Sequence, residues 1–115
     1  MSLKMSTREV NGVIIVDLNG QITLGEASAS VRDEVRDQTS HGFLKILLNL
    51  GNVTYIDSAG LGELTAAYTS VKNKNGQLKL LNLTKRVHDL MQITKLYTVF
   101  DVYDDEKMAV ASFGS

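Results

Sequence analysis

The chain has 115 residues, of which 43% are hydrophobic and 22% charged, and it contains no cysteine. This composition is typical of one compact globular domain, and a chain of this length can bury about two-thirds of its unfolded surface. Twelve Lys and Arg residues against 13 Asp and Glu residues give a net charge of −1. We therefore expect no general attraction to nucleic acid or anionic membranes, and the lack of cysteine excludes disulfides, thiolate metal sites and cysteine nucleophiles.

No apolar run approaches the roughly 20 residues that a transmembrane helix needs. The longest runs are Val13 to Val16 and Ile46 to Leu48. The N-terminal segment lacks the apolar core of a signal peptide; its first three residues are candidates for an expression remnant, and Met5 is a candidate natural start. We expect a cytoplasmic protein without direct membrane insertion, made of a single domain over residues 1–115.

The first half of the chain predicts two paired strands, a helix and a third strand. Extended runs over residues 3–10 and 13–19 meet at Asn11-Gly12, a dipeptide that tolerates the positive φ angles of a tight hairpin turn. The continuous apolar run within the second predicts a strand covered on both faces. Apolar positions every four residues predict an amphipathic helix over residues 25–41, with Gly42 as its stop. Residues 43–50 predict another buried strand, followed by a turn from residue 50 to residue 58.

The second half alternates helices and strands. A helix is expected from Ser58 to about Asn75-Gly76, then a strand over residues 78–83, then a helix for which Thr84 is the candidate cap. Residues 99–103 predict a last strand, and acidic residues 104–106 start a terminal helix, because the helix dipole favours negative charge there. The order β-β-α-β-α-β-α-β-α predicts an α/β fold with a mixed, largely parallel sheet, an N-terminal β-hairpin and four helices.

The segment Tyr55-Ile-Asp-Ser-Ala-Gly-Leu-Gly-Glu-Leu64 is the most informative, because it joins a strand to a helix with a serine at the junction. Sites in open α/β sheets form beyond the carboxyl ends of the strands, where this segment should lie. A phosphate on Ser58 would lie among free backbone N–H groups at the positive end of the helix dipole. Gly60 and Gly62 suggest close approach by another chain, or a backbone that stays bare near a phosphate.

The simpler interpretation is structural: Asp57 or Ser58 only caps the helix, since both residue types are favoured at that position. Catalysis by Ser58 would need a base within hydrogen-bond reach. The candidates are weak, because His41 should end one helix, His88 should lie on another, and no Gly-x-Ser-x-Gly elbow surrounds the serine.

Other functional patterns have less support. Gly60-Leu-Gly62 is too short for a dinucleotide fingerprint or a P-loop, and the acidic residues 101–106 lack the spacing of a calcium loop. Five basic residues span separate predicted elements without aromatic interleaving, which favours a solvated surface over a nucleic-acid site. They are Lys72, Lys74, Lys79, Lys85 and Arg86. We expect no catalytic residue, no metal ligand and no cofactor.

The motif Asp57-Ser58-Ala59-Gly60-Leu61-Gly62 resembles the signature of the STAS domain family, as found in bacterial anti-sigma factor antagonists. The resemblance covers nearly the whole chain, since it extends to Gly20-Gln21-Ile22-Thr23, to Leu48-Asn49-Leu50 and to the strand after Asn75-Gly76. It implies a STAS-like fold. It also implies that Ser58 is the residue phosphorylated by an ATP-dependent anti-sigma factor kinase, and that the partner-binding turn comprises Asp57, Ser58, Gly60, Leu61 and Gly62.

The resemblance further implies partner switching. The unphosphorylated protein would bind the anti-sigma factor kinase and free a sigma factor, phosphorylation of Ser58 would end that binding, and a phosphoserine phosphatase would restore it. Two departures from the family pattern are Ala59, which leaves Ser58 as the only phosphoacceptor in the motif, and Gln21 with Thr23, where acidic residues are common. A monomer or weak homodimer is expected. The alternatives within the family are a scaffold of a large signalling assembly and an accessory subunit of a membrane lipid or anion transport complex.

Overall fold

Five strands and four α-helices make up the computed structural model, which describes residues 3–114. The elements confirm the predicted order and add one 3₁₀-helix, η1. They are β1 (Leu3–Val10), β2 (Val13–Ile22), α1 (Glu26–Ser40), β3 (Lys45–Ile56), α2 (Ser58–Asn73), β4 (Gln77–Leu81), α3 (Lys85–Thr94), η1 (Leu96–Thr98), β5 (Val102–Tyr103) and α4 (Glu106–Ser112).

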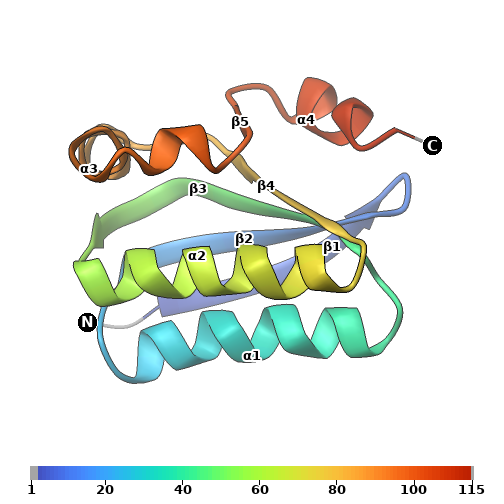
Figure 1. Cartoon of the computed structure of the whole chain (residues 1–115), viewed down its shortest axis with the longest axis horizontal. Coiled ribbons are helices and arrows are strands. Elements are labelled where there is room, and N and C mark those ends of the chain that lie inside the picture. Colours follow the sequence, from blue (N-terminus) through green and yellow to red (C-terminus); the bar gives the residue numbers. More distant parts are fainter. Residues whose placement is uncertain (1–2, 115) are drawn as a thin grey trace.

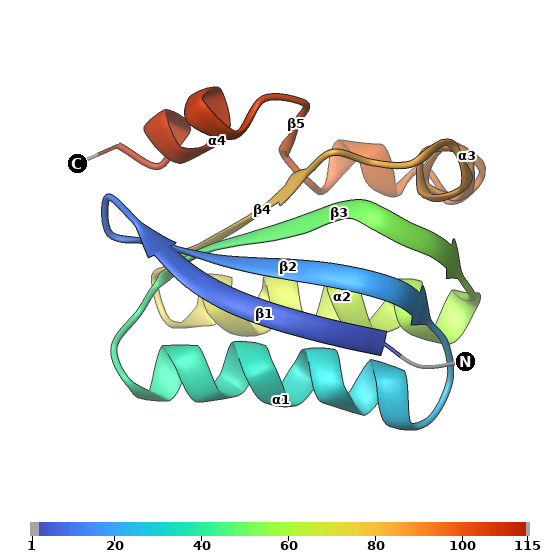
Figure 2. The ribbon, with the colours of Figure 1, turned by 180° about the vertical axis from the view of Figure 1, so that it is seen from behind.

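The strands form one sheet in the order β1-β2-β3-β4-β5. Strand β1 is antiparallel to β2, and the remaining neighbours are parallel, as predicted. The hairpin turn takes positive φ angles at both Asn11 (51°) and Gly12 (83°), which suits the right-handed twist of the strands it joins. Helices α1 and α2 lie on one side of the sheet, and α3 and α4 on the other (Figures 1 and 2).

The core lies on both faces of the central strands, because their side chains alternate between two buried sides. Ile14 and Val16 of β2 belong to the larger cluster, with the apolar residues of α1 and α2. Val13 and Ile15 belong to the smaller cluster, which packs against α4. The prediction that β2 is covered on both faces is therefore confirmed.

The predicted boundaries of the third and fifth strands differ most from the structure. The expected turn from residue 50 to residue 58 is instead strand up to Ile56, because β3 keeps pairing with β2 past Gly51-Asn52, where β2 has an irregular register. The expected strand over residues 99–103 is only Val102–Tyr103. Phe100 turns inward instead, and its ring meets that of Tyr68 edge-on with 5.4 Å between the centroids.

Lys79 also departs from expectation, since the five basic residues were predicted to be solvated. Its side chain points to the sheet face under α4, and the residue is only 7% exposed. Its Nζ donates to the carbonyl and hydroxyl oxygens of Ser112, each at 3.0 Å, and lies 4.9 Å from the ring centroid of Phe113. These contacts satisfy the buried ammonium and hold the end of α4 on the sheet.

The acidic residues near the C-terminus serve the start of α4, as predicted. The Asp105 side chain accepts a hydrogen bond from the backbone N–H of Met108 at 3.1 Å. The Glu106 carboxylate pairs with Arg8 of β1, and Arg8 also pairs with Asp17 of β2. No helix within residues 3–114 is long and apolar enough to cross a membrane.

Candidate functional site

The Asp57 carboxylate organises the turn between β3 and α2. Its Oδ1 accepts a hydrogen bond from the backbone N–H of Gly60 at 2.7 Å, which makes Asp57 the N-cap of α2. Its Oδ2 accepts a hydrogen bond from the backbone N–H of Leu24 at 3.0 Å. One carboxylate thus joins the start of α2 to the loop between β2 and α1.

These hydrogen bonds favour the ionised carboxylate. The backbone N–H of Gly60, and then that of Leu24, lower the pKa of Asp57 below its ordinary value, while partial burial opposes them. Asp57 therefore carries a negative charge at neutral pH, directly beside Ser58.

Gly60 and Gly62 differ in their surroundings, although the sequence offered the same two explanations for both: close approach by another chain, or bare backbone near a phosphate. A Cβ on Gly60 would lie 2.1 Å from the carbonyl oxygen of Ile22, so the close approach at Gly60 comes from this chain's own β2 and not from another chain. A Cβ on Gly62 would meet nothing within 4 Å, and Gly62 is exposed. Only Gly62 leaves bare backbone at the surface.

Ser58 is the first residue of α2, and it is exposed. Asp57 supplies the capping oxygen. Helix capping therefore explains the presence of Asp57 but not that of Ser58. Leu61, three residues further along, is 3% exposed and belongs to the core. Of the residues expected to form the partner-binding turn, Ser58 and Gly62 are exposed, Asp57 is half-buried, and Gly60 and Leu61 are buried.

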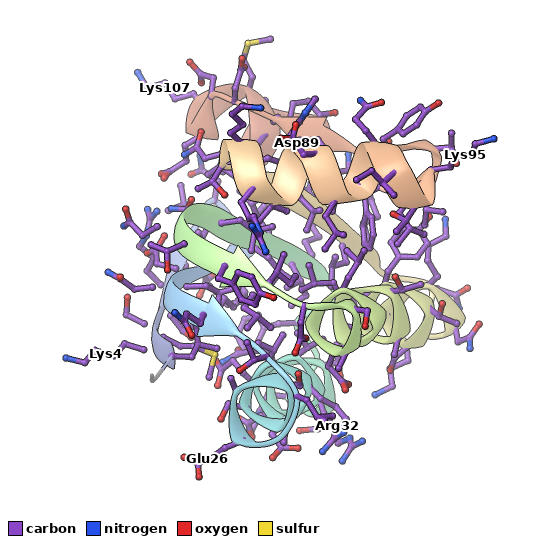
Figure 3. All side chains as sticks on the ribbon, turned by 90° about the vertical axis from the view of Figure 1, so that its left-hand side faces the viewer. Lys4, Glu26, Arg32, Asp89, Lys95 and Lys107 are labelled. Atoms are coloured by element: carbon purple, nitrogen blue, oxygen red, sulfur yellow. The ribbon has the colours of Figure 1, made fainter. Side chains whose placement is uncertain are left out.

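A groove of about 470 Å³ runs between this turn and α3. The turn side contributes Tyr55, Ile56, Asp57 and Ser58, and the α3 side contributes Arg86, Asp89, Leu90 and Ile93. Figure 3 is seen from the end at which α2 begins; it shows α3, with Asp89 labelled, above the sheet, and α1, with Arg32, below it. The guanidinium carbon of Arg86 lies 4.3 Å from the ring centroid of Tyr55.

Two exposed apolar side chains belong to segments that adjoin the turn. Leu24 is 79% exposed, and the bond from its N–H to Asp57 fixes its loop beside the start of α2. Ile93 is 78% exposed and lines the groove with Ser58. The sequence analysis missed Leu24, Ile93 and the placement of Arg86, because an apolar residue in a loop or on a helix does not reveal its exposure.

The two histidines contact residues other than the serine. His41 follows the end of α1, where its Nδ1 lies 2.8 Å from the carbonyl oxygen of Asp37. His88 has an exposed side chain whose Nδ1 lies 3.7 Å from Asp89. Neither is among the residues that line the groove at Ser58. Within residues 3–114, neither candidate base forms a hydrogen bond with Ser58.

Comparison with known proteins identifies the family. A family model described as the STAS domain matches residues 4–109. The chain belongs to the STAS domain family. A curated STAS relative from Paenibacillus polymyxa, the anti-sigma F factor antagonist, is 31% identical over 115 residues, which cover 96% of this chain and 94% of the relative.

Solved structures share the fold of this STAS domain. An anti-sigma factor antagonist from Mycobacterium paratuberculosis aligns with a TM-score of 0.84 at 17% identity, over 99% of this chain and 96% of that one. The Bacillus cell fate determinant SpoIIAA in its phosphorylated form aligns with a TM-score of 0.74 at 18% identity, over 95% of this chain and 98% of that one. At these identities the likeness concerns the fold alone.

Replacing each of the two glycines by alanine should have opposite effects on the free energy of unfolding. Gly60→Ala should lower the free energy of unfolding by about 1–3 kcal/mol, because its Cβ would overlap the Ile22 carbonyl oxygen. Gly62→Ala should raise it by about 0.5–1 kcal/mol, because alanine favours the helix and meets open space. Urea unfolding measures both. A stabilising Gly60→Ala or a destabilising Gly62→Ala would contradict the geometry of the turn.

The contribution of Asp57 to the free energy of unfolding should depend on pH. At pH 7, Asp57→Ala should lower the free energy of unfolding by about 0.5–2 kcal/mol, the usual effect of losing a helix cap. Because the pKa of Asp57 is lowered in the folded state, its stabilisation is complete above an unfolded-state pKa of about 3.9 and is lost as pH falls through the folded-state pKa.

Urea unfolding of wild type and Asp57→Ala at pH 7 and at about pH 2.5 tests this dependence. The difference between the two proteins should shrink at the lower pH. Asp57→Asn is the matched control, since it keeps one acceptor oxygen but places an amide donor against the second backbone N–H. A difference that stays constant with pH would mean that ionised Asp57 does not hold the turn.

Proposed function

We propose that this STAS domain is an anti-sigma factor antagonist whose binding is controlled by phosphorylation of Ser58. The observation that carries the proposal is an exposed hydroxyl at the first residue of α2, beside an aspartate that already satisfies the cap. Because Asp57 supplies the capping oxygen, the helix start does not need the Ser58 hydroxyl as its cap. The relationship to the anti-sigma F factor antagonist of Paenibacillus polymyxa, 31% identical, supports the same function.

The surface around Ser58 fits an apolar partner. Leu24, whose backbone N–H binds Asp57, and Ile93, which lines the groove with Ser58, expose most of their side chains. Burying such a side chain fully contributes about 1.5–3 kcal/mol. Gly62 adds exposed backbone that a partner can approach closely. We propose that an anti-sigma factor covers Ser58, Gly62, Leu24 and Ile93 together, while the buried Gly60 and Leu61 fix the shape of the turn and Asp57 holds it.

Phosphorylation would end this binding by local electrostatics. A phosphoserine adds about −1.5 to −2 charges and three strong acceptor oxygens. Asp57, ionised by its two backbone donors, already places a negative charge next to Ser58. An apolar partner surface would remove water from the phosphate without pairing it, which makes the complex unfavourable. No refolding of the domain is required.

The proposal includes the enzymes that phosphorylate and dephosphorylate Ser58. An ATP-dependent serine kinase, which is the anti-sigma factor itself, transfers the phosphate to Ser58, and a phosphoserine phosphatase removes it. The domain is then a substrate and a binder in the cytoplasm, and it catalyses no reaction of its own.

Binding to the anti-sigma factor of the native host tests the proposal. Ser58→Asp should weaken binding at least about 100-fold, because a desolvated, unpaired charge costs several kcal/mol, whereas Ser58→Ala should bind within a few-fold of wild type. Ser70→Asp is the matched control, since it places the same charge at an exposed serine near the other end of α2. Isothermal titration calorimetry measures all four affinities.

Incubation with the anti-sigma factor and ATP gives the second readout. Mass spectrometry should find one phosphate on wild type and none on Ser58→Ala. Equal affinity of wild type and Ser58→Asp, or phosphorylation that persists in Ser58→Ala, would overturn the proposal and favour a scaffold or transport role.

A further inference from the structure

We propose that the guanidinium of Arg86 binds a phosphate on Ser58, so that the phosphorylated state contains an ion pair between α2 and α3. The inference rests on the proposed phosphorylation of Ser58. It assigns a new role to a side chain outside the serine motif, and it predicts that the phosphorylated surface is internally paired and not merely negative.

Arg86 is fixed on the side of the groove that faces Ser58. It is the second residue of α3, and the hydroxyl of the preceding cap, Thr84, donates to the carbonyl oxygen of Val53 at 3.0 Å. This bond ties the start of α3 to β3, the strand that leads into Ser58. The guanidinium then lies over Tyr55, which comes only three residues before Ser58.

The contact with the Tyr55 ring leaves the guanidinium able to bind an anion. A guanidinium that lies over an aromatic face keeps its N–H groups at the edge of the plane, and this planar fork matches two phosphate oxygens. Among residues 3–114, no carboxylate forms an ion pair with Arg86. Its N–H groups are therefore available for a new partner.

The other charged groups at the groove are already engaged or are negative. Asp57 accepts from the two backbone N–H groups described above, and Asp89 accepts a hydrogen bond from Lys85 at 2.8 Å. Arg86 is the one cation among the described residues that line the groove. A phosphate placed between Asp57 and Asp89 would be repelled by both, and Arg86 is the cationic side chain among the described lining residues that can offset this repulsion.

The pairing adds a second effect to the switch. In the unphosphorylated domain, Arg86 offers a cation to a partner that covers the groove. In the phosphorylated domain, the same cation is held by the phosphate, so a partner loses a contact as well as meeting a negative charge. Arg86 is a positioning residue for the phosphate and takes no part in its transfer.

Titration of the phosphate by ³¹P NMR tests the contact. Phosphoserine is installed at position 58 during translation by stop-codon suppression, in wild type and in Arg86→Met. Because an adjacent opposite charge favours the dianion, Arg86→Met should raise the second pKa of the phosphate by about 0.5 or more. Arg36→Met, which removes an exposed arginine on α1, controls for net charge and should change this pKa little.

Other groups near the phosphate are held constant. His88 lies 3.7 Å from Asp89, which lines the groove, so every protein in the comparison also carries His88→Gln. Asp57, Asp89 and Lys85 are present in all of them. The ¹⁵N signal of the Arg86 side chain gives a direct readout, because it should shift when Ser58 is replaced by phosphoserine.

The outcomes separate this inference from the proposed function. Identical phosphate titrations in wild type and Arg86→Met, or an Arg86 side-chain signal that does not move, would overturn the ion pair. Neither measurement needs a kinase or an anti-sigma factor, so failure here leaves the binding result for Ser58→Asp intact. Conversely, if Ser58→Asp binds the anti-sigma factor as tightly as wild type, the ³¹P titration still shows whether Arg86 contacts the phosphate.

Discussion

The structure at the serine motif depends on one carboxylate that accepts two backbone hydrogen bonds. The Asp57 carboxylate accepts hydrogen bonds from the N–H of Gly60, in the first turn of α2, and from the N–H of Leu24, in the loop before α1. Loss of the first bond would leave the N–H of the buried Gly60 unpaired, and loss of the second would release a link between segments that are 33 residues apart in sequence. The exposure of Ser58 follows, because the aspartate takes the capping role that the serine would otherwise fill.

The sheet brings these segments together. Parallel pairing of β2 and β3 continues to the last residues of both strands, where Ile22 lies opposite Ile56. The two strands therefore end side by side, and Gly60 can approach the Ile22 carbonyl more closely than any residue with a Cβ would allow. Apolar packing on both faces of β2 and β3 fixes this register, since a shift of one residue would turn their core side chains to the opposite faces.

Local chemistry allowed much of the fold to be predicted from the sequence. Asn11-Gly12 marks the hairpin, and Thr84 caps α3 by accepting from the backbone N–H of Val87. The end of β3 was missed because Gly51-Asn52 interrupts its apolar pattern, while its true limit is set by pairing with β2. Lys79 was missed for a similar reason: α4 covers it, and nothing near it in the sequence indicates that cover.

The residues of the candidate site also fall into two groups: those that the sequence could identify and those that only the fold brings to the site. The serine, the aspartate and the glycines stand in one short motif, so the sequence was enough to select them. Leu24, Arg86 and Ile93 come from separate elements, and only the fold places them around Ser58. Together with Ser58 they form a surface that combines exposed apolar side chains, one cation and an exposed hydroxyl.

The central claim is that phosphorylation changes the charge at Ser58 while the turn held by Asp57 stays in place. Amide hydrogen exchange at Gly60 and Leu24, compared between the free domain and the same domain with phosphoserine at position 58, tests this most directly. The account predicts that both amides keep their protection to within about three-fold. Loss of protection at both amides by ten-fold or more would mean that the phosphate opens the turn, and would contradict a local electrostatic switch.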